Sequence, residues 1–231
     1  MRFAFYISGK SQRLYKFIKQ AATETLETVY LVVSDQQIEP ELHNICKKYS
    51  INVSVNIYKS IQGNDNKEKN LNLSKWMLEQ LVNNKIDYCF SFGNHILAGE
   101  LLERYGNKLI NFHPAILPMY PGLNAIDKAA DEGRAFLIGN TAHFIDSGVD
   151  SGKIIMQTVM PINEFLRECD YDMILDLQIP MLNSLIRVIL EDRLVVDDIG
   201  NVKISGADYS CHAIFPFFDM GGSEFLGEGD E

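Results

Sequence analysis

Asn111 and His113, at the end of the apolar run KLINF (108–112), place an amide and an imidazole two positions apart. If this run forms a strand, residues two positions apart point to the same face of the sheet. Prolines prevent the strand from continuing, which leaves the pair at its carboxyl edge. These prolines are Pro114, Pro118 and Pro121. An amide and an imidazole placed there can stabilise an oxygen that becomes negatively charged, although an isolated N-x-H pair is also consistent with structural hydrogen bonding.

A second polar cluster lies in TAHFIDSGVDSGKII (141–155), which offers His143, Asp146 and Asp150 around a glycine-containing turn. A carboxylate can keep a nearby imidazole charged and can help to relay protons. Asp and Gly are also the commonest turn residues, so Asp146 could simply cap the bend. Taken alone, neither cluster decides between a functional and a structural role.

The elements that must position these residues are read from apolar periodicity. Short runs of β-forming residues predict strands at 3–8, 29–34, 51–58, 86–92 and 108–112. Apolar residues three and four apart predict helices at 14–22, 38–49 and 73–82. This alternation indicates an α/β fold with a mainly parallel sheet and flanking helices. In such a sheet, ligands bind outside the carboxyl ends of the strands.

The remaining segments have less regular patterns. The polar stretch GNDNKEKNLN (63–72) is interpreted as a flexible loop. FLIGNTAHFID (136–146) and GKIIMQTVMPI (152–162) predict two strands joined by a tight connection. A long helix is predicted over 168–191, with a kink or break at Pro180.

Residues 1–192 are expected to form the main domain, and residues 193–231 a C-terminal extension. The extension contains LVVDD and NVKIS, which predict a small hairpin, and the Phe-rich patch AIFPFF (213–218). Exposed aromatic residues favour association with a partner, so we expect a homodimer with a contact through this extension.

Composition excludes several classes of function. The chain has 231 residues, a formal net charge of −10 and a pI near 5.0, which argues against a nucleic-acid partner. Its 4 cysteines form no CxxC pair, so we expect reduced thiols and no metal site. The first apolar run is far shorter than a signal-peptide core or a membrane span. We therefore expect a cytoplasmic protein without a membrane partner.

Both polar clusters together resemble the 10-formyltetrahydrofolate-dependent formyltransferase family. That family includes glycinamide ribonucleotide transformylase, methionyl-tRNA formyltransferase and the nucleotide-sugar N-formyltransferases. The residues that carry the resemblance, in matching order and spacing, are Asn111, His113, Pro114, LPMYPG (117–122), Gly139, Thr141, His143, Asp150 and Gly152. The likeness covers roughly residues 2–190 and implies a Rossmann-like formyltransferase fold. It also implies 10-formyltetrahydrofolate as co-substrate, with no metal required.

The resemblance implies that Asn111, His113 and Asp150 are catalytic. In this chemistry an amine attacks the formyl carbon, and the carbonyl oxygen becomes an oxyanion. The Asn111 amide and a protonated His113 are expected to donate to that oxygen, while Asp150 keeps His113 charged and aids proton transfer. Matching positions imply folate contacts at Ile96, Leu97, Asp146, Gly148 and Val149.

The identity of the acceptor amine is inferred from two loops in which this sequence differs from the family pattern. ISGKSQRL (7–14) replaces the glycine-serine-asparagine loop of the glycinamide ribonucleotide enzymes, and SFGNHIL (91–97) has Asn94 and His95 in place of a methionine-arginine pair. These departures favour the amino group of a nucleotide-linked dideoxysugar. The alternatives are glycinamide ribonucleotide, hydrolysis of the donor, or a non-catalytic folate-binding protein. The residues expected to contact the acceptor are Gly9, Lys10, Ser11, Arg13 and Asn94.

Overall fold

The computed structural model describes residues 1–131, 135–162 and 171–210, and its centre is a 7-stranded sheet in the order β3-β2-β1-β4-β5-β6-β7. The strands are β1 (Phe3–Ile7), β2 (Val29–Ser34), β3 (Asn52–Val55), β4 (Tyr88–Phe92), β5 (Leu109–His113), β6 (Leu137–Phe144) and β7 (Ile154–Pro161). Neighbouring strands from β3 to β5 pair in parallel, whereas β6 is antiparallel to both β5 and β7. The predicted mainly parallel sheet is therefore confirmed.

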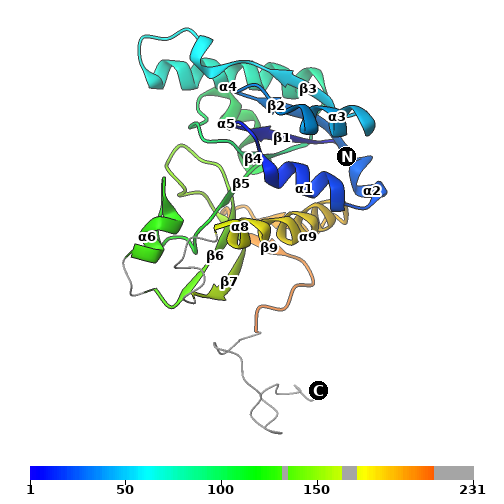
Figure 1. The fold of residues 1–231 in the computed structure, drawn as a ribbon. Helices are drawn as coiled ribbons and strands as arrows, with labels where there is room; N and C mark the ends of the chain where they lie inside the picture. Colours follow the sequence, from blue (N-terminus) through cyan, green and yellow to red (C-terminus); the bar gives the residue numbers. More distant parts are fainter. Residues whose placement is uncertain (132–134, 163–170, 211–231) are drawn as a thin grey trace, which may run out of the picture.

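Helices cover both faces of the sheet (Figure 1). They are α1 (Gln12–Gln20), α2 (Thr23–Leu26), α3 (Pro40–Lys48), α4 (Asn66–Asn83), α5 (Glu100–Tyr105), α6 (Ala125–Asp131), α8 (Tyr171–Asp176) and α9 (Gln178–Leu190), with 3₁₀ turns η1 (Tyr58–Ser60) and η2 (Gly106–Lys108). Strand β1 shows why both faces are covered, because its side chains alternate between two cores. Phe3 and Phe5 pack with α1, α3 and α9, and Ala4 and Tyr6 pack with α4 and α5.

Helix α4 begins at Asn66, inside the stretch that was interpreted as a loop, so that interpretation is wrong from this residue onward. The carboxylate of Asp65 accepts the backbone N–H of Glu68 at 2.8 Å, and the Glu68 carboxylate accepts the N–H of Asn64 at 2.8 Å. These reciprocal bonds satisfy backbone donors at the start of the helix. The sequence signal for this helix start is the capping pair Asp65 and Glu68, which apolar periodicity does not reveal.

The predicted long helix is two helices, α8 and α9, with Leu177 between them. Pro180 is the third residue of α9, where its missing N–H costs no intrahelical bond. The break predicted near this proline is confirmed, and residues 168–170 lie outside the described residues. By length and composition the segment Asp172–Leu190 could cross a membrane, but the apolar side chains of α9 belong to the core beside β1.

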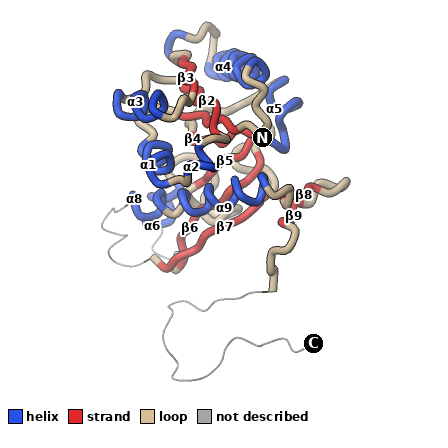
Figure 2. Tube along the Cα trace, turned by 90° about the vertical axis from the view of Figure 1, so that its right-hand side faces the viewer, coloured by secondary structure: helices blue, strands red, loops and turns tan. Residues whose placement is uncertain are grey.

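The predicted C-terminal hairpin consists of β8 (Leu194–Val196) and β9 (Val202–Ile204), beside the end of α9 (Figure 2). Ile204 is buried in the same core cluster as α9, so the hairpin packs against the main sheet of its own chain. The AIFPFF patch (213–218) lies outside the described residues. The domain division and the homodimer remain predictions.

Candidate active site

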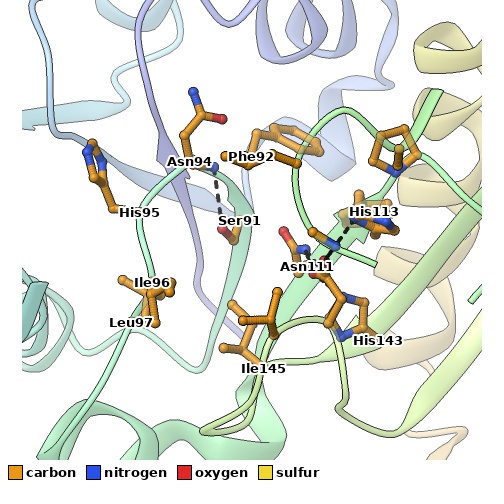
Figure 3. A pocket seen from close by; sticks show the side chains of 18 of the residues that line it. Ser91, Phe92, Asn94, His95, Ile96, Leu97, Asn111, His113, His143 and Ile145 are labelled. Atoms are coloured by element: carbon orange, nitrogen blue, oxygen red, sulfur yellow. Dashed lines mark hydrogen bonds and ion pairs between the residues drawn. The ribbon is translucent and has the colours of Figure 1, made fainter. Parts of the chain in front are cut away.

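A cleft of about 500 Å³ lies beyond the carboxyl ends of β4 and β5. The strand order reverses between β1 and β4, which is where α/β sheets place their ligands. Asn111, His113 and His143 lie on one side of the cleft, and Ile96 and Leu97 face them from the other (Figure 3).

The structure brings the predicted trio together at the floor of this cleft. Asn111 and His113 are on β5, with the same side-chain parity. Asp150 lies in the turn between β6 and β7, with a left-handed φ of 50°. Its Oδ2 lies 3.2 Å from Nδ1 of His113, and its Oδ1 lies 3.4 Å from Nδ2 of Asn111. The turn therefore returns its carboxylate to the end of β5.

Both ring nitrogens of His113 face protein oxygens. Nε2 lies 2.8 Å from the carbonyl oxygen of Tyr120, to which it donates, and Nδ1 faces Asp150. A doubly protonated imidazolium satisfies both acceptors at once. The expectation that His113 donates directly to a substrate oxygen does not match this arrangement. In this geometry protein oxygens occupy both nitrogens of the buried ring.

The amide of Asn111 is the freer donor of the pair. Its Nδ2 contacts Oδ1 of Asp150 at 3.4 Å and Nε2 of His143 at 3.3 Å. Both distances are at the long end of the range for hydrogen bonds. A developing oxyanion in the cleft can therefore compete for these amide hydrogens, as the predicted role requires.

His143 was present in the sequence motif but was given no role. It stands on β6 directly opposite Asn111 in the antiparallel register, and its Nδ1 donates to the Phe144 carbonyl oxygen at 2.8 Å. In the neutral ring, Nε2 accepts from Asn111, and in the charged ring it donates to Asp150 at 3.5 Å. The sequence signal that could have identified it is strand pairing, which single-strand periodicity does not provide.

Asp150 is held as a carboxylate by its neighbours. Burial disfavours its charged form, but hydrogen bonds from His143 and the Gly122 amide, together with the positive charges of His113 and His143, outweigh burial. The pKa of Asp150 therefore lies below its ordinary value. The Gly122 N–H donates to Oδ2 at 2.8 Å.

The proline-rich segment after β5 is fixed mainly by side chains of the neighbouring strands. The hydroxyl of Thr141 donates to the Ala115 carbonyl oxygen at 2.7 Å and accepts the Leu117 N–H at 3.0 Å. Gln157 donates both to that hydroxyl, at 2.8 Å, and to the Leu117 carbonyl oxygen, at 2.9 Å. The segment that presents Gly122 to Asp150 is thus tied to β6 and β7.

The residues expected to contact folate all line the cleft, and they are Ile96, Leu97, Asp146, Gly148 and Val149. Ile96 and Val149 are exposed, as is Leu123, which the sequence reasoning missed. Exposed apolar side chains around one cleft suit a planar ring system. Asp146 also caps its turn, because its Oδ1 accepts the Gly148 N–H at 3.0 Å and the Ser151 hydroxyl at 2.8 Å.

The residues expected to contact the acceptor divide into two groups. Arg13 and Asn94 line the cleft, whereas Gly9, Lys10 and Ser11 are not among its lining residues. Lys10 is 78% exposed and its Nζ lies 3.9 Å from the Glu39 carboxylate. Lys10 does not line the cleft because of the turn that carries it. Gly9 and Ser11 both have left-handed φ angles, and Lys10 lies at the tip between them.

Arg13 is a cation that lacks a counter-charge within the part of the chain that the structure describes. Its Nη1 donates to Oε1 of the buried Gln178 at 2.6 Å, and its guanidinium lies 4.6 Å from the centre of the Phe92 ring. Burial lowers the pKa of Arg13 to about 10, which leaves it charged at neutral pH. A cation held this way on a cleft wall suits an anionic ligand group.

Among the described residues, no group of three or more His, Cys, Asp and Glu side chains is arranged to hold a metal ion.

Solved structures of similar fold include phosphoribosylglycinamide formyltransferase from Anaplasma phagocytophilum, with a TM-score of 0.75 and 25% identity over 90% of this chain and 96% of that one. Glycinamide ribonucleotide transformylase 1 from Symbiobacterium toebii has a TM-score of 0.73 and 24% identity, covering 88% of this chain and 93% of that one. A formyltetrahydrofolate deformylase from Pseudomonas syringae pv. tomato has a TM-score of 0.66 and 20% identity, covering 88% of this chain and 65% of that one. The predicted Rossmann-like formyltransferase fold is thereby confirmed.

Similarity in sequence is more local. Phosphoribosylglycinamide formyltransferase from Bacillus subtilis (strain 168) is 38% identical over 89 residues, which cover 38% of this chain and 45% of that enzyme. The trifunctional purine biosynthetic protein adenosine-3 of Drosophila melanogaster is 38% identical over 74 residues, 32% of this chain and 5% of that protein. The match thus spans less than half the length of these relatives. The family model for formyl transferases, however, matches residues 1–172, and the chain therefore belongs to the formyl transferase family.

Proposed function

We propose that this protein transfers the formyl group of 10-formyltetrahydrofolate to the amino group of glycinamide ribonucleotide. The observation that carries the proposal is the clustering of Asn111 and His113 around Asp150, at 3.4 and 3.2 Å from its carboxylate, at the floor of an apolar-walled cleft. This arrangement combines a displaceable amide donor, a charged imidazole and a carboxylate that supports the charge.

The acceptor differs from the one that the two divergent loops favoured. Three of the relatives described above are named for phosphoribosylglycinamide or glycinamide ribonucleotide, and none of those described is named for a nucleotide sugar. The preference for a nucleotide-linked dideoxysugar rested on the loops ISGKSQRL (7–14) and SFGNHIL (91–97), and Arg13 is the residue of the first loop that lines the cleft. Glycinamide ribonucleotide is therefore the better-supported acceptor, and the nucleotide sugar becomes the competing outcome of the test.

The proposed reaction begins when the acceptor amine attacks the formyl carbon and the carbonyl oxygen takes the negative charge. Asn111 donates its amide hydrogens to that oxygen and gives up its long contacts to Asp150 and His143. His113 stabilises the same charge electrostatically. Collapse of the intermediate breaks the bond from carbon to N10 of the folate. The proton lost by the amine reaches N10, and Asp150 is the carboxylate placed to assist that transfer.

Arg13 and Asn94 are the proposed contacts for the acceptor's phosphate. Arg13 carries a positive charge without a paired carboxylate among the described residues, and Gln178 fixes its orientation. Asn94 lines the same cleft. A fixed guanidinium pre-organised in this way loses little side-chain entropy on binding an anion.

The proposal is tested by supplying 10-formyltetrahydrofolate with either glycinamide ribonucleotide or a 4-amino-4,6-dideoxyhexose nucleotide. The ultraviolet change that accompanies tetrahydrofolate release reports turnover. Release with glycinamide ribonucleotide alone supports the proposal. Release only with the amino-sugar nucleotide would overturn the choice of acceptor, and no release with either would point to a non-catalytic folate-binding protein.

A further inference from the structure

Outside the trio, a second carboxylate–imidazole pair lies at the edge of the cleft, formed by Asp35 and His95. Asp35 directly follows β2 and is fully buried, whereas the His95 side chain, after β4, is 24% exposed and lines the cleft. Nδ1 of His95 lies 2.7 Å from Oδ2 of Asp35. Neither residue has a role in the proposed chemistry.

The Asp35 carboxyl group connects the ends of β1, β2 and β4. The same Oδ2 atom accepts the hydroxyl of Tyr6 at 2.6 Å and the hydroxyl of Ser8 at 2.6 Å, in addition to His95. One carboxyl oxygen therefore takes part in three hydrogen bonds, to residues at the ends of different strands. Its Oδ1 is buried and has no hydrogen-bond partner among the described residues. Of these three partners of Oδ2, His95 is the one that lines the cleft.

The segment from Gly93 to Leu97 forms the cleft wall opposite the trio, and side chains hold it from several directions. The Asn94 N–H donates to the Ser8 hydroxyl at 2.9 Å, so Ser8 links this segment to Asp35. The Tyr6 ring packs against the backbone of Gly93 so closely that a Cβ at this position would lie 2.1 Å from the ring. Following the segment, the Ala98 N–H donates to the Ser74 hydroxyl at 2.9 Å.

The His95 ring is clamped on two sides. Its edge is bound by Asp35, and its face stacks on Tyr58, with ring centres 3.6 Å apart and planes 21° apart. The next two residues along the chain are Ile96 and Leu97, the predicted folate contacts. A clamp on His95 therefore fixes the backbone that presents them.

We infer that Asp35 and His95 act together as positioning residues that hold the 93–97 wall in its folate-binding conformation. This inference rests on the proposed function, because it assigns Ile96 and Leu97 of the wall to the folate donor. The pair contacts the wall and not the trio, so it governs the affinity for the donor and leaves the chemical step nearly unchanged. The two residues act through one interaction, so their effects are coupled.

The test compares Asp35→Asn, His95→Gln and the double variant, with His43→Gln on the exposed side of α3 as the matched control. The affinity for a folate analogue in which carbon replaces N10 is measured by calorimetry, and kcat is measured at saturating donor. Each single variant is expected to weaken analogue binding by about tenfold. The double variant is expected to lose no more affinity than the single variant with the larger loss, because both substitutions remove the same interaction. In every variant kcat is expected to stay within about twofold of wild type, because the trio is untouched.

Unchanged analogue affinity, additive losses or a parallel fall in kcat would each overturn the inference. If Asp35→Asn does not fold, His95→Gln and Tyr58→Leu are compared in its place, since each removes one contact on the clamped ring. Failure of the wild-type protein to bind the analogue would instead refute the proposed folate function. Normal wild-type binding that is insensitive to these variants would refute the positioning role alone.

Discussion

Oδ2 of Asp150 lies 3.2 Å from Nδ1 of His113, and this contact joins the turn after β6 to the end of β5. The position of the carboxylate is fixed further by the Gly122 N–H, which donates to the same oxygen at 2.8 Å. A strand end, a proline-rich segment and a turn thus meet at one carboxylate.

Removing the donor or the carboxylate should impair the chemical step. Asn111→Ala and Asp150→Asn are each expected to lower kcat by about a hundred- to a thousand-fold, because each removes stabilisation of the oxyanion or of the charged imidazole. Circular dichroism and the affinity for a non-reactive folate should remain close to wild type. Full activity in either variant would remove the proposed mechanism.

The lowered pKa of Asp150 predicts a specific dependence of stability on pH. In the unfolded chain this carboxyl titrates near its ordinary value of about 3.9, and in the folded protein it titrates lower. Its contribution to stability is therefore fully present above about pH 4 and is lost as the pH falls through the folded pKa. Thermal unfolding of wild type and Asp150→Asn between about pH 3 and 7 checks this, and parallel curves over that range would contradict it.

Gly152 should tolerate no side chain. A Cβ there would lie 1.7 Å from the Phe144 carbonyl oxygen, the same oxygen that orients His143 at 2.8 Å. Gly152→Ala is expected to destabilise the protein by about 1–3 kcal/mol and to reduce activity beyond that, because the clash displaces the partner of His143. The matched control is Gly106→Ala, since a Cβ at Gly106 meets no atom within 4 Å. Differential scanning calorimetry should separate the two variants, and equal unfolding temperatures would refute the steric argument.

Arg13 should determine the affinity for the acceptor. Arg13→Gln is expected to raise the KM for glycinamide ribonucleotide by about tenfold or more, while kcat changes little, because a charge-assisted contact to an anion is lost. Lys10→Gln removes a neighbouring charge that is 78% exposed and should leave that KM unchanged. Steady-state kinetics decide the matter, and a larger effect at Lys10 would contradict the assignment.

Sequence patterns predicted the positions of the strands well, because buried β-forming runs such as VYLVVS coincide with β2 (Val29–Ser34). They also predicted that Asn111 and His113 share a face. They failed where side-chain contacts decide the structure. The first turns of α4 depend on the Asp65–Glu68 capping pair, and Lys10 leaves the cleft because its neighbours adopt left-handed backbone angles.

Contacts between distant segments were outside the reach of the sequence patterns. The pairing of Asp35 with His95 joins the ends of β2 and β4, and no local period or motif links those two positions. The arrangement of the His113 ring was also beyond prediction, since it depends on the path that brings the Tyr120 carbonyl oxygen to Nε2. Both depend on the strand order of the finished sheet.

The central claim is formyl transfer to an amine, and the fate of the formyl carbon tests it most directly. Wild-type protein is incubated with glycinamide ribonucleotide and 10-formyltetrahydrofolate carrying ¹³C in the formyl group, and the label is followed by NMR. The label is expected to appear as an amide carbon on the glycinamide product, and Asn111→Ala is expected to slow its appearance by about a hundred-fold or more. Label that accumulates as free formate, or that remains on the folate, would contradict it.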